Sequence, residues 1–180
     1  MKVITTKRLY MRPLSEEDAT QRYVDWLNDP VVNRYLETRH STQTVGSCKA
    51  FIEQCDRDEY AHLYGIFMRD TGKHIGNAKL GFIHEQYARG ELSLFIGDKD
   101  FWGKGLAGEV VQGLTQYGFE CLELEKVEAG CYEDNLASLR VFLKAGYTVE
   151  GFKRSHVESS GSRSGCFMLG IIKSEFGQNG

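Results

Sequence analysis

A glycine-rich segment near the middle of the chain has the residue types that bind phosphate groups. Residues 103–108 read Gly-Lys-Gly-Leu-Ala-Gly, a G-x-G-x-x-G pattern, between an expected strand and an expected helix. Such a turn presents free backbone N–H groups at a helix N-terminus, and its glycines let phosphate oxygens approach closely. We therefore predict that the segment 101–108 binds a phosphate or pyrophosphate group. A tight turn that uses its glycines only for packing is the alternative.

The glycine pattern by itself fits more than one ligand. A nicotinamide dinucleotide fold places it at the start of a long doubly wound sheet, with an acidic residue about 20 positions further on. Here the pattern begins at residue 103 of 180, and Glu128 and Asp134 meet the acidic requirement poorly. A nucleoside triphosphate loop requires Gly-Lys followed by Ser or Thr, whereas Lys104 is followed by Gly105. A nicotinamide-dependent oxidoreductase therefore rests on the glycine pattern alone.

A second motif follows the glycine segment and favours a different ligand. Residues 135–138 have the form N-x-x-[SA] after an expected strand, and the helix that they open ends at a glycine–aromatic pair, Gly146 and Tyr147. Two ordered motifs at this separation are more specific than either motif alone. With both, residues 91–147 resemble the GNAT acetyltransferase superfamily.

The glycine segment matches the family's loop with one departure. That loop has the form [QR]-x-x-G-x-[GA], and Gly105 and Ala107 match its two small positions. Trp102 stands in place of Gln or Arg, which looks like the "WGKG" variant of the RimJ/RimL-like branch that contains ribosomal-protein N-terminal acetyltransferases. The resemblance implies acetyl-CoA as co-substrate and an acetyltransferase reaction.

The resemblance also implies which residues hold acetyl-CoA. Backbone N–H groups of the glycine segment would bind the pyrophosphate, and the main chain of the strand before it would pair with the pantetheine arm. Asn135 would hydrogen-bond that arm, although a plain helix N-cap is its other role. The full expected set is Phe95, Ile96, Gly97, Trp102, Gly103, Lys104, Gly105, Leu106, Ala107, Asn135 and Ser138.

The implied reaction needs a base for the amine and an acid for the leaving thiolate. Glu91 is the candidate base, because it starts the strand expected to carry the acetyl group and has the spacing from Gly105 of the base glutamate in the histone acetyltransferase branch. A solvated glutamate is the alternative. Many relatives have a tyrosine as acid where this chain has Phe142, so Ser138 is the replacement, and Tyr147 is expected in the core. Phe142 also motivates a non-catalytic acyl-CoA-binding module as an alternative function.

The first sixty residues are expected to form one wall of the acceptor groove. The stretch 26–36 looks like a pattern in small acetyltransferases of polysaccharide and amino-sugar pathways. Four residues could meet the phosphate and base of a nucleotide sugar, namely Arg34, Tyr35, Arg39 and His40, and Trp26 is a further candidate contact. His84, beside Glu85, would face the groove from the other side. Core packing, groove lining or an exposed hairpin end is the alternative for these residues.

Chain length and apolar periodicity predict an α/β, mixed α+β chain that forms one domain over residues 1–180, and the resemblance implies that this is an N-acetyltransferase domain. Together they imply the GNAT acyl-CoA N-acyltransferase fold, whose mostly antiparallel central sheet has about seven strands and is flanked by four helices. Two helices are expected to bury the stripes Val45, Cys48, Phe51, Ile52, Cys55 and Leu106, Val110, Leu114, Tyr117, Cys121. The expected helices are 15–28, 42–57, 106–122 and 135–145, and the expected strands are 8–12, 64–68, 74–83, 91–97, 126–132, 147–157 and 165–173, with a turn at 159–162.

Composition limits the partners and the compartment. A net charge of −3 gives no basic footprint for nucleic acid, and the sequence has no apolar run that predicts a signal peptide or a membrane span. The five cysteines are odd in number and lack C-x-x-C spacing, so a disulfide framework or metal site is not expected. These features predict a cytoplasmic protein that acts on a small-molecule or peptide amine, with a homodimer as a possible assembly.

Overall fold

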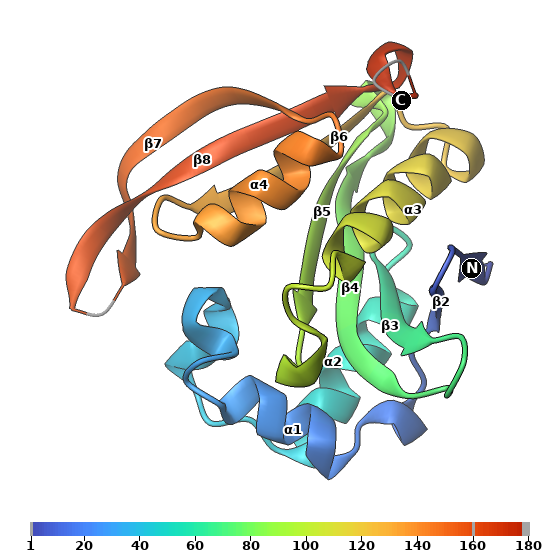
Figure 1. Ribbon diagram of the computed structural model, residues 1–180, viewed down its shortest axis with the longest axis vertical. Coiled ribbons are helices and arrows are strands. Elements are labelled where there is room, and N and C mark those ends of the chain that lie inside the picture. The colour runs from blue at the N-terminus through green and yellow to red at the C-terminus, as the bar shows by residue number, and fades with distance from the viewer. Residues whose placement is uncertain (1, 160, 178–180) are drawn as a thin grey trace.

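A single mixed sheet runs through the molecule, and four helices cover it (Figure 1). The computed structural model describes residues 2–159 and 161–177. The sheet has eight strands in the order β1-β2-β3-β4-β5-β6-β8-β7. The strands are β1 (Ile4–Thr5), β2 (Leu9–Pro13), β3 (His62–Met68), β4 (His74–His84), β5 (Arg89–Ile96), β6 (Lys126–Tyr132), β7 (Thr148–Ser159) and β8 (Ser162–Ile172), and the helices are α1 (Gln21–Asn28), α2 (Val45–Arg57), α3 (Leu106–Cys121) and α4 (Leu136–Lys144).

This architecture confirms the expected fold class and element order. The eighth strand is β1, a two-residue strand that pairs with β2 and is too short to have a period-two signal. The expected turn at 159–162 includes Ser160, which lies outside the described residues. Among the described residues, no helix is long and apolar enough to cross a membrane.

Two apolar clusters lie on opposite faces of the sheet. One packs α3 and α4 against the sheet, and the other packs α1 and α2 against it. Figure 1 shows α3 and α4 beside each other on one face, with the β7–β8 hairpin reaching beyond them. The expected stripe of α3 is buried except for Cys121, which is exposed because it is the last residue of the helix. On α2, Phe51 is also exposed, and its ring lies 5.8 Å from the Lys79 ammonium at the surface.

The first helix begins later than its sequence pattern predicts. Residues 16–18 form only a short 3-10 turn after Ser15. The Asp18 carboxylate accepts the Ser15 N–H at 2.8 Å and two hydrogen bonds from the Arg12 guanidinium at 2.7 Å. This ion pair fixes the turn, and α1 starts only after Thr20, whose hydroxyl accepts the Tyr23 N–H. The acidic residues 16–18 therefore belong to a separate short turn, in which Asp18 caps the Ser15 N–H and also binds Arg12 of β2.

The sheet opens between β5 and β6. These two strands are parallel and pair only from Arg89 to Glu91 with Lys126 to Glu128. Beyond these rungs β5 continues to Ile96, paired with β4, and β6 continues to Tyr132, paired with β8. The neighbouring edges of β5 and β6 are therefore left without each other's hydrogen bonds, and the gap between them positions the site described below.

Gly76 permits an unusually close approach of β4 to β5 at this opening. A Cβ atom at Gly76 would lie 2.2 Å from the Phe95 carbonyl oxygen and 2.9 Å from the Ile96 Cα. We expect Gly76→Ala to destabilise the protein by about 1–3 kcal/mol, because a backbone must shift to admit the methyl group. Urea unfolding measures this change.

Gly108→Ala is the matched control. A Cβ atom at Gly108, in the first turn of α3, meets nothing within 4 Å, so alanine should be neutral or stabilise by about 0.5–1 kcal/mol. Equal midpoints for the two variants would contradict the close approach of the strands.

Candidate active site

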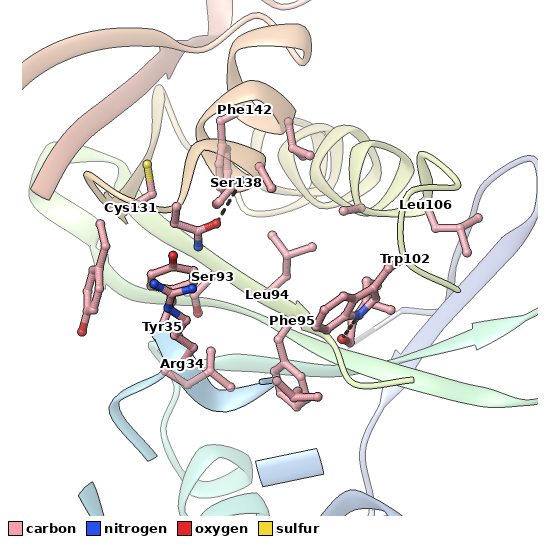
Figure 2. Close-up of a pocket in the computed structure, with 18 of the residues that line it drawn as sticks. Arg34, Tyr35, Ser93, Leu94, Phe95, Trp102, Leu106, Cys131, Ser138 and Phe142 are labelled. Carbon is pink, nitrogen blue, oxygen red and sulfur yellow. Dashed lines mark hydrogen bonds between the residues drawn. The ribbon is translucent and has the colours of Figure 1, made fainter. Parts of the chain in front are cut away.

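A pocket of about 710 Å³ occupies the gap between β5 and β6. Its walls come from β5, the turn before α3, the end of β6, the first turns of α4, and the segment 31–36. Figure 2 shows Trp102 and Leu106 at one end of this pocket and Arg34 and Tyr35 at the other. The opening of the sheet thus brings both predicted motifs and part of the predicted acceptor wall into one cavity.

The turn before α3 presents unpaired N–H groups to the pocket. Gly103 and Gly105 have φ values of 71° and 76°, the left-handed region that glycine adopts without a steric penalty. Gly105 is the N-cap residue of α3, and no side chain caps this end. The first N–H groups of a helix have no partner within the helix, so an uncapped end attracts anions. This geometry fits the predicted pyrophosphate-binding segment.

Trp102 fastens this turn to the open strand. Its indole Nε1 donates to the Ile96 carbonyl oxygen at 2.7 Å, and its ring lines the pocket (Figure 2). A Gln or Arg at this position could donate a similar bond only with a flexible side chain. The tryptophan instead supplies both the bond and a rigid apolar wall.

A second fastening of the turn was not predicted from the sequence. The Arg8 guanidinium donates to the Lys104 carbonyl oxygen at 2.9 Å and to the Glu109 carboxylate at 2.5 Å. The Lys104 side chain does not line the pocket, and its ammonium lies 5.2 Å from the centre of the Phe101 ring. Lys104 therefore helps to hold the turn through its carbonyl group, which accepts the Arg8 bond, while its charged side chain lies outside the pocket.

The open edge of β5 provides main chain from Leu92 to Ile96. Gly97 lies outside the pocket, and its N–H donates to the Ile75 carbonyl oxygen at 2.8 Å, so that N–H is not free for a ligand. Trp26 packs against Gly97 and Phe95 with only 7% of its surface exposed. The structure therefore places Trp26 behind the strand, where it has no contact with the pocket.

The first turns of α4 close the pocket from above. The Asn135 side-chain oxygen accepts the Ser138 N–H at 3.2 Å, which confirms the N-cap, and Asn135 also lines the pocket. Ser138 and Phe142 both line the cavity. Tyr147 is buried, and its hydroxyl pairs with that of Thr115 at 2.7 Å, so it lies in the core as expected. Among the predicted acid candidates, only the Ser138 hydroxyl reaches the pocket.

The end of the pocket beside Arg34 is lined by the aromatic rings of Tyr35 and Tyr132. Tyr35 donates to the Asp134 carbonyl oxygen at 3.2 Å and meets the ring of Tyr132 edge-on. The Arg34 guanidinium lies 5.1 Å over the Tyr35 ring and has no acidic partner among the ion pairs of the described residues. Arg34 and Tyr35 therefore line the pocket as predicted, with an unpaired cation at its rim.

Arg39, one of the candidate acceptor contacts, connects this end to the end of β6 and to the β7–β8 hairpin. Its guanidinium donates to the Leu36 carbonyl oxygen at 2.8 Å, the Tyr132 hydroxyl at 2.9 Å and the Glu158 carbonyl oxygen at 2.8 Å. Tyr132 in turn donates to the Glu37 carboxylate. Tyr132 stands at the end of the strand before the Asn135 motif, which is the one sequence signal that pointed to it.

Glu91 lies just beyond the pocket, at the last rung that joins β5 to β6. The next two residues, Leu92 and Ser93, line the cavity. Burial raises the pKa of the Glu91 carboxyl, and the negative charge of Glu128 raises it further. Its carboxylate is therefore more basic than that of an exposed glutamate. Glu91 itself lies one residue before the part of β5 that lines the cavity.

His84 and Glu85 lie at the far end of β4, outside the pocket. The His84 ring stacks on Tyr87 with centres 4.2 Å apart, and Tyr60 donates to the Glu85 carboxylate at 3.4 Å. The structure does not bring these two residues to the other predicted site residues. Among the described residues, no three His, Cys, Asp or Glu side chains gather as a metal site.

Comparisons with known proteins agree with this geometry. Residues 8–148 match the family model of the acetyltransferase (GNAT) domain. The probable N-acetyltransferase YjcK of Bacillus subtilis (strain 168) is 39% identical over 176 residues, which cover 92% of this chain and 94% of that protein.

Solved structures share the fold at lower identity. A spermidine N-acetyltransferase from Vibrio cholerae in complex with CoA and spermine has a TM-score of 0.85 at 17% identity, with 94% of this chain and 98% of that chain covered. RimL, a ribosomal L7/L12 alpha-N-protein acetyltransferase in complex with coenzyme A, has a TM-score of 0.86 at 18% identity, with 95% and 98% covered. These two proteins differ in acceptor, so the shared fold leaves the acceptor open.

The Trp102 bond to Ile96 gives a prediction for cofactor binding. Trp102→Phe keeps an aromatic wall but removes the indole donor, which loosens the turn from β5. We expect CoA affinity to fall about 3–10-fold with little change in stability, as for the loss of one hydrogen bond. Calorimetry with CoA measures the change.

Lys104→Gln is the control for that measurement. Because the Lys104 side chain lies outside the pocket, we expect CoA affinity to change less than about twofold, a surface-charge effect. A larger loss in Lys104→Gln than in Trp102→Phe would show that the side-chain charge, not the fastening of the turn, governs binding.

Proposed function

We propose that this chain, which belongs to the GNAT acetyltransferase family and is an acetyl-CoA-dependent N-acetyltransferase, acetylates a primary amine that carries an anionic group. An amino sugar that carries a phosphate or nucleotide is our first choice of acceptor, and a protein N-terminus with a nearby carboxylate is the second. The observation that supports this is the single pocket that joins the uncapped turn, the open edge of β5 and the unpaired Arg34. We also propose that it acts in the cytoplasm, where its five free cysteines stay reduced.

The chain's own groups are placed to hold acetyl-CoA, which supplies the activated acetyl thioester. The N–H groups of the turn from Gly103 to Ala107 would take the pyrophosphate. The main chain of β5 from Leu94 to Ile96 would pair with the pantetheine arm as an added strand, and the Asn135 amide nitrogen would donate to it. These assignments follow from the unpaired backbone edge and from the pocket that these residues line.

Glu91 is the proposed base. A primary amine is mostly protonated at neutral pH, as the lysine reference pKa of about 10.4 shows, so it must lose a proton before its nitrogen attacks the thioester carbon. Glu91 lies next to Leu92 and Ser93 on β5 but outside the cavity, so it would take the proton through a water molecule. General-base catalysis of this kind contributes roughly 10²–10⁴-fold.

Ser138 is the proposed proton donor to the leaving sulfur. As the new C–N bond forms, the C–S bond breaks and the electron pair leaves on sulfur. Phe142 cannot donate a proton, whereas the Ser138 hydroxyl lines the same part of the pocket. The contribution of this step is small, because a thiol with a reference pKa of about 8.5 is already a fair leaving group.

The acceptor assignment rests on Arg34 and Tyr35. A guanidinium stacked on a ring and free of acidic partners is suited to bind a phosphate or carboxylate in two-pronged fashion. The same charge repels a polycation, so polyamines such as spermine are expected to be poor acceptors. A panel with an amino-sugar nucleotide, a polyamine and a peptide N-terminus, with thiol release as readout, tests this order. Turnover of the polyamine alone would overturn it.

A non-catalytic acyl-CoA-binding module, the alternative suggested by Phe142, is not our proposal, because the chain belongs to a family of acetyltransferases. Tight CoA binding without turnover of any amine would contradict the proposed function.

Removing the proposed base gives the clearest test of catalysis. We expect Glu91→Gln to lower kcat by about 10²-fold or more while the affinity for CoA is unchanged, because Glu91 does not line the pocket. Steady-state kinetics and calorimetry on the same preparation separate the two effects. Full activity in this variant would exclude Glu91 as the base.

The same substitution has a pH-dependent effect on stability. The pKa of Glu91 is higher in the folded state than in the unfolded state. This carboxyl therefore contributes stability at a pH below its unfolded-state pKa, and the contribution is lost as the pH rises through the folded-state pKa. We therefore expect Glu91→Gln to gain stability relative to the wild type between pH 4.5 and pH 8, measured by thermal unfolding. An advantage that shrinks with rising pH would contradict the raised pKa.

Arg34→Gln tests the acceptor end. Loss of a charged two-pronged contact should raise KM for an anionic amine about 10–100-fold and leave kcat/KM for a neutral amine within about twofold. Arg34→Lys should give an intermediate KM, because a lysine keeps the charge but not the fork. Equal effects on both amines would show that Arg34 stabilises the wall of the pocket and does not bind the anionic group of the acceptor.

A further inference from the structure

Two carboxylates face each other where β5 and β6 part. Glu91 and Glu128 are directly paired in the parallel register, at the last rung before the gap. The preceding pair, Gly90 and Val127, points to the face covered by α3, where Val127 is fully buried. Successive residues of a strand point to opposite faces, so both carboxylates lie on the other face. Neighbouring strands are about 4.8 Å apart, which places the two acids side by side.

The two acids differ in their partners. Glu128 accepts a hydrogen bond from Arg89 Nη1 at 2.7 Å and lies 3.4 Å from the Lys126 ammonium. Lys126 in turn bonds the Glu150 carboxylate at 2.7 Å. Glu91 makes none of the hydrogen bonds or ion pairs found within residues 2–159 and 161–177. The available cations therefore bind one acid of the pair and leave the other without a partner.

The charged and titratable groups around Glu91 come from every neighbouring strand. Lys79 of β4, Arg89 of β5 and Lys153 of β7 act on it as positive charges from beyond ion-pair distance, and Cys166 of β8 is also near. The β4 residue directly opposite is Gly81, which has no side chain to hydrogen-bond it. The strongest interaction with a single neighbouring group is the repulsion from Glu128.

We propose that Glu128 is a positioning residue for Glu91: held by Arg89 and Lys126, it keeps Glu91 the unpaired member of the pair and makes it the one that takes the proton of the amine. This inference rests on the proposed function, in which Glu91 is the base. Of two adjacent acids in unlike surroundings, one can be held in ion pairs while the other accepts a proton. The ion-paired acid here, Glu128, lies on β6, so it acts on Glu91 from across the opening of the sheet.

Glu128→Gln tests the proposal with a nearly isosteric change. Removing the charge beside Glu91 should move the acid limb of the kcat/KM–pH profile to lower pH by roughly one unit, the size expected for the loss of a neighbouring charge. The carboxyl ¹³C resonance of Glu91, assigned by its absence in Glu91→Gln, should titrate with a midpoint lower by the same amount. A midpoint and an acid limb that stay in place would overturn the proposal.

Two further variants keep the test decisive. Glu150→Gln removes a carboxylate from the far side of Lys126 without a contact to Glu91, and it should leave the midpoint unchanged. Arg89→Gln removes a positive charge near both acids, and it should move the Glu91 midpoint to higher pH. A shift in Glu150→Gln as large as in Glu128→Gln would show a general charge effect and overturn the specific role. A lower midpoint in Arg89→Gln would contradict the charge coupling between these groups and overturn the proposal as well.

The same measurements separate this proposal from the function that it rests on. If Glu91→Gln is inactive but the Glu91 midpoint does not respond to Glu128→Gln, the base stands and the positioning role falls. If Glu91→Gln keeps full activity, the base role fails and the positioning role fails with it, even where the resonance still shows that the two carboxyls interact.

Discussion

The parting of β5 and β6 is the constraint on which the rest of the structure depends. Three parallel rungs hold the strands together, and beyond them each strand pairs only with its outer neighbour. An unpaired backbone edge in a protein interior is costly unless something else bonds it. Here the open edge of β5 faces a cavity that a ligand with its own amide groups can enter. The opening that would destabilise an ordinary sheet thus creates the surface of the pocket. The two acids Glu91 and Glu128 lie at the last residue pair before the strands part.

The other parts of the site are held at fixed distances from that opening by contacts between distant segments. The Trp102 indole bonds the turn to β5, and the Arg8 guanidinium bonds the same turn from the N-terminal part of the sheet. The proposed acceptor wall is held by the Tyr35 ring, which packs against Tyr132 and donates to the Asp134 carbonyl oxygen. This contact also joins the wall to the segment that leads into α4.

Local sequence patterns predicted the elements and the family, but not the contacts between them. The Asn135 cap, the α3 start after Gly105 and the order of elements along the chain follow from short-range signals, and the structure confirms them. The short β1 strand and the turn after Ser15 were missed because they depend on pairing with β2 and on the Arg12–Asp18 ion pair. Trp26 was placed in the acceptor groove from its neighbours in sequence, whereas its position behind Gly97 is decided by how α1 packs on the sheet. Glu91 and Glu128 lie opposite each other because of the register between the parallel strands β5 and β6, which no local sequence pattern specifies.

The guanidinium of Arg39 joins the loop after α1, the end of β6 and the outer β7–β8 hairpin at a single point. These three segments are far apart in sequence, yet none of them can change its backbone path there without breaking a bond to the same side chain. Grafting a new acceptor loop onto this scaffold would therefore succeed only if the hairpin and the strand end were exchanged with it. In a lineage that changes its acceptor, these three segments are expected to diverge together while the glycine turn stays constant.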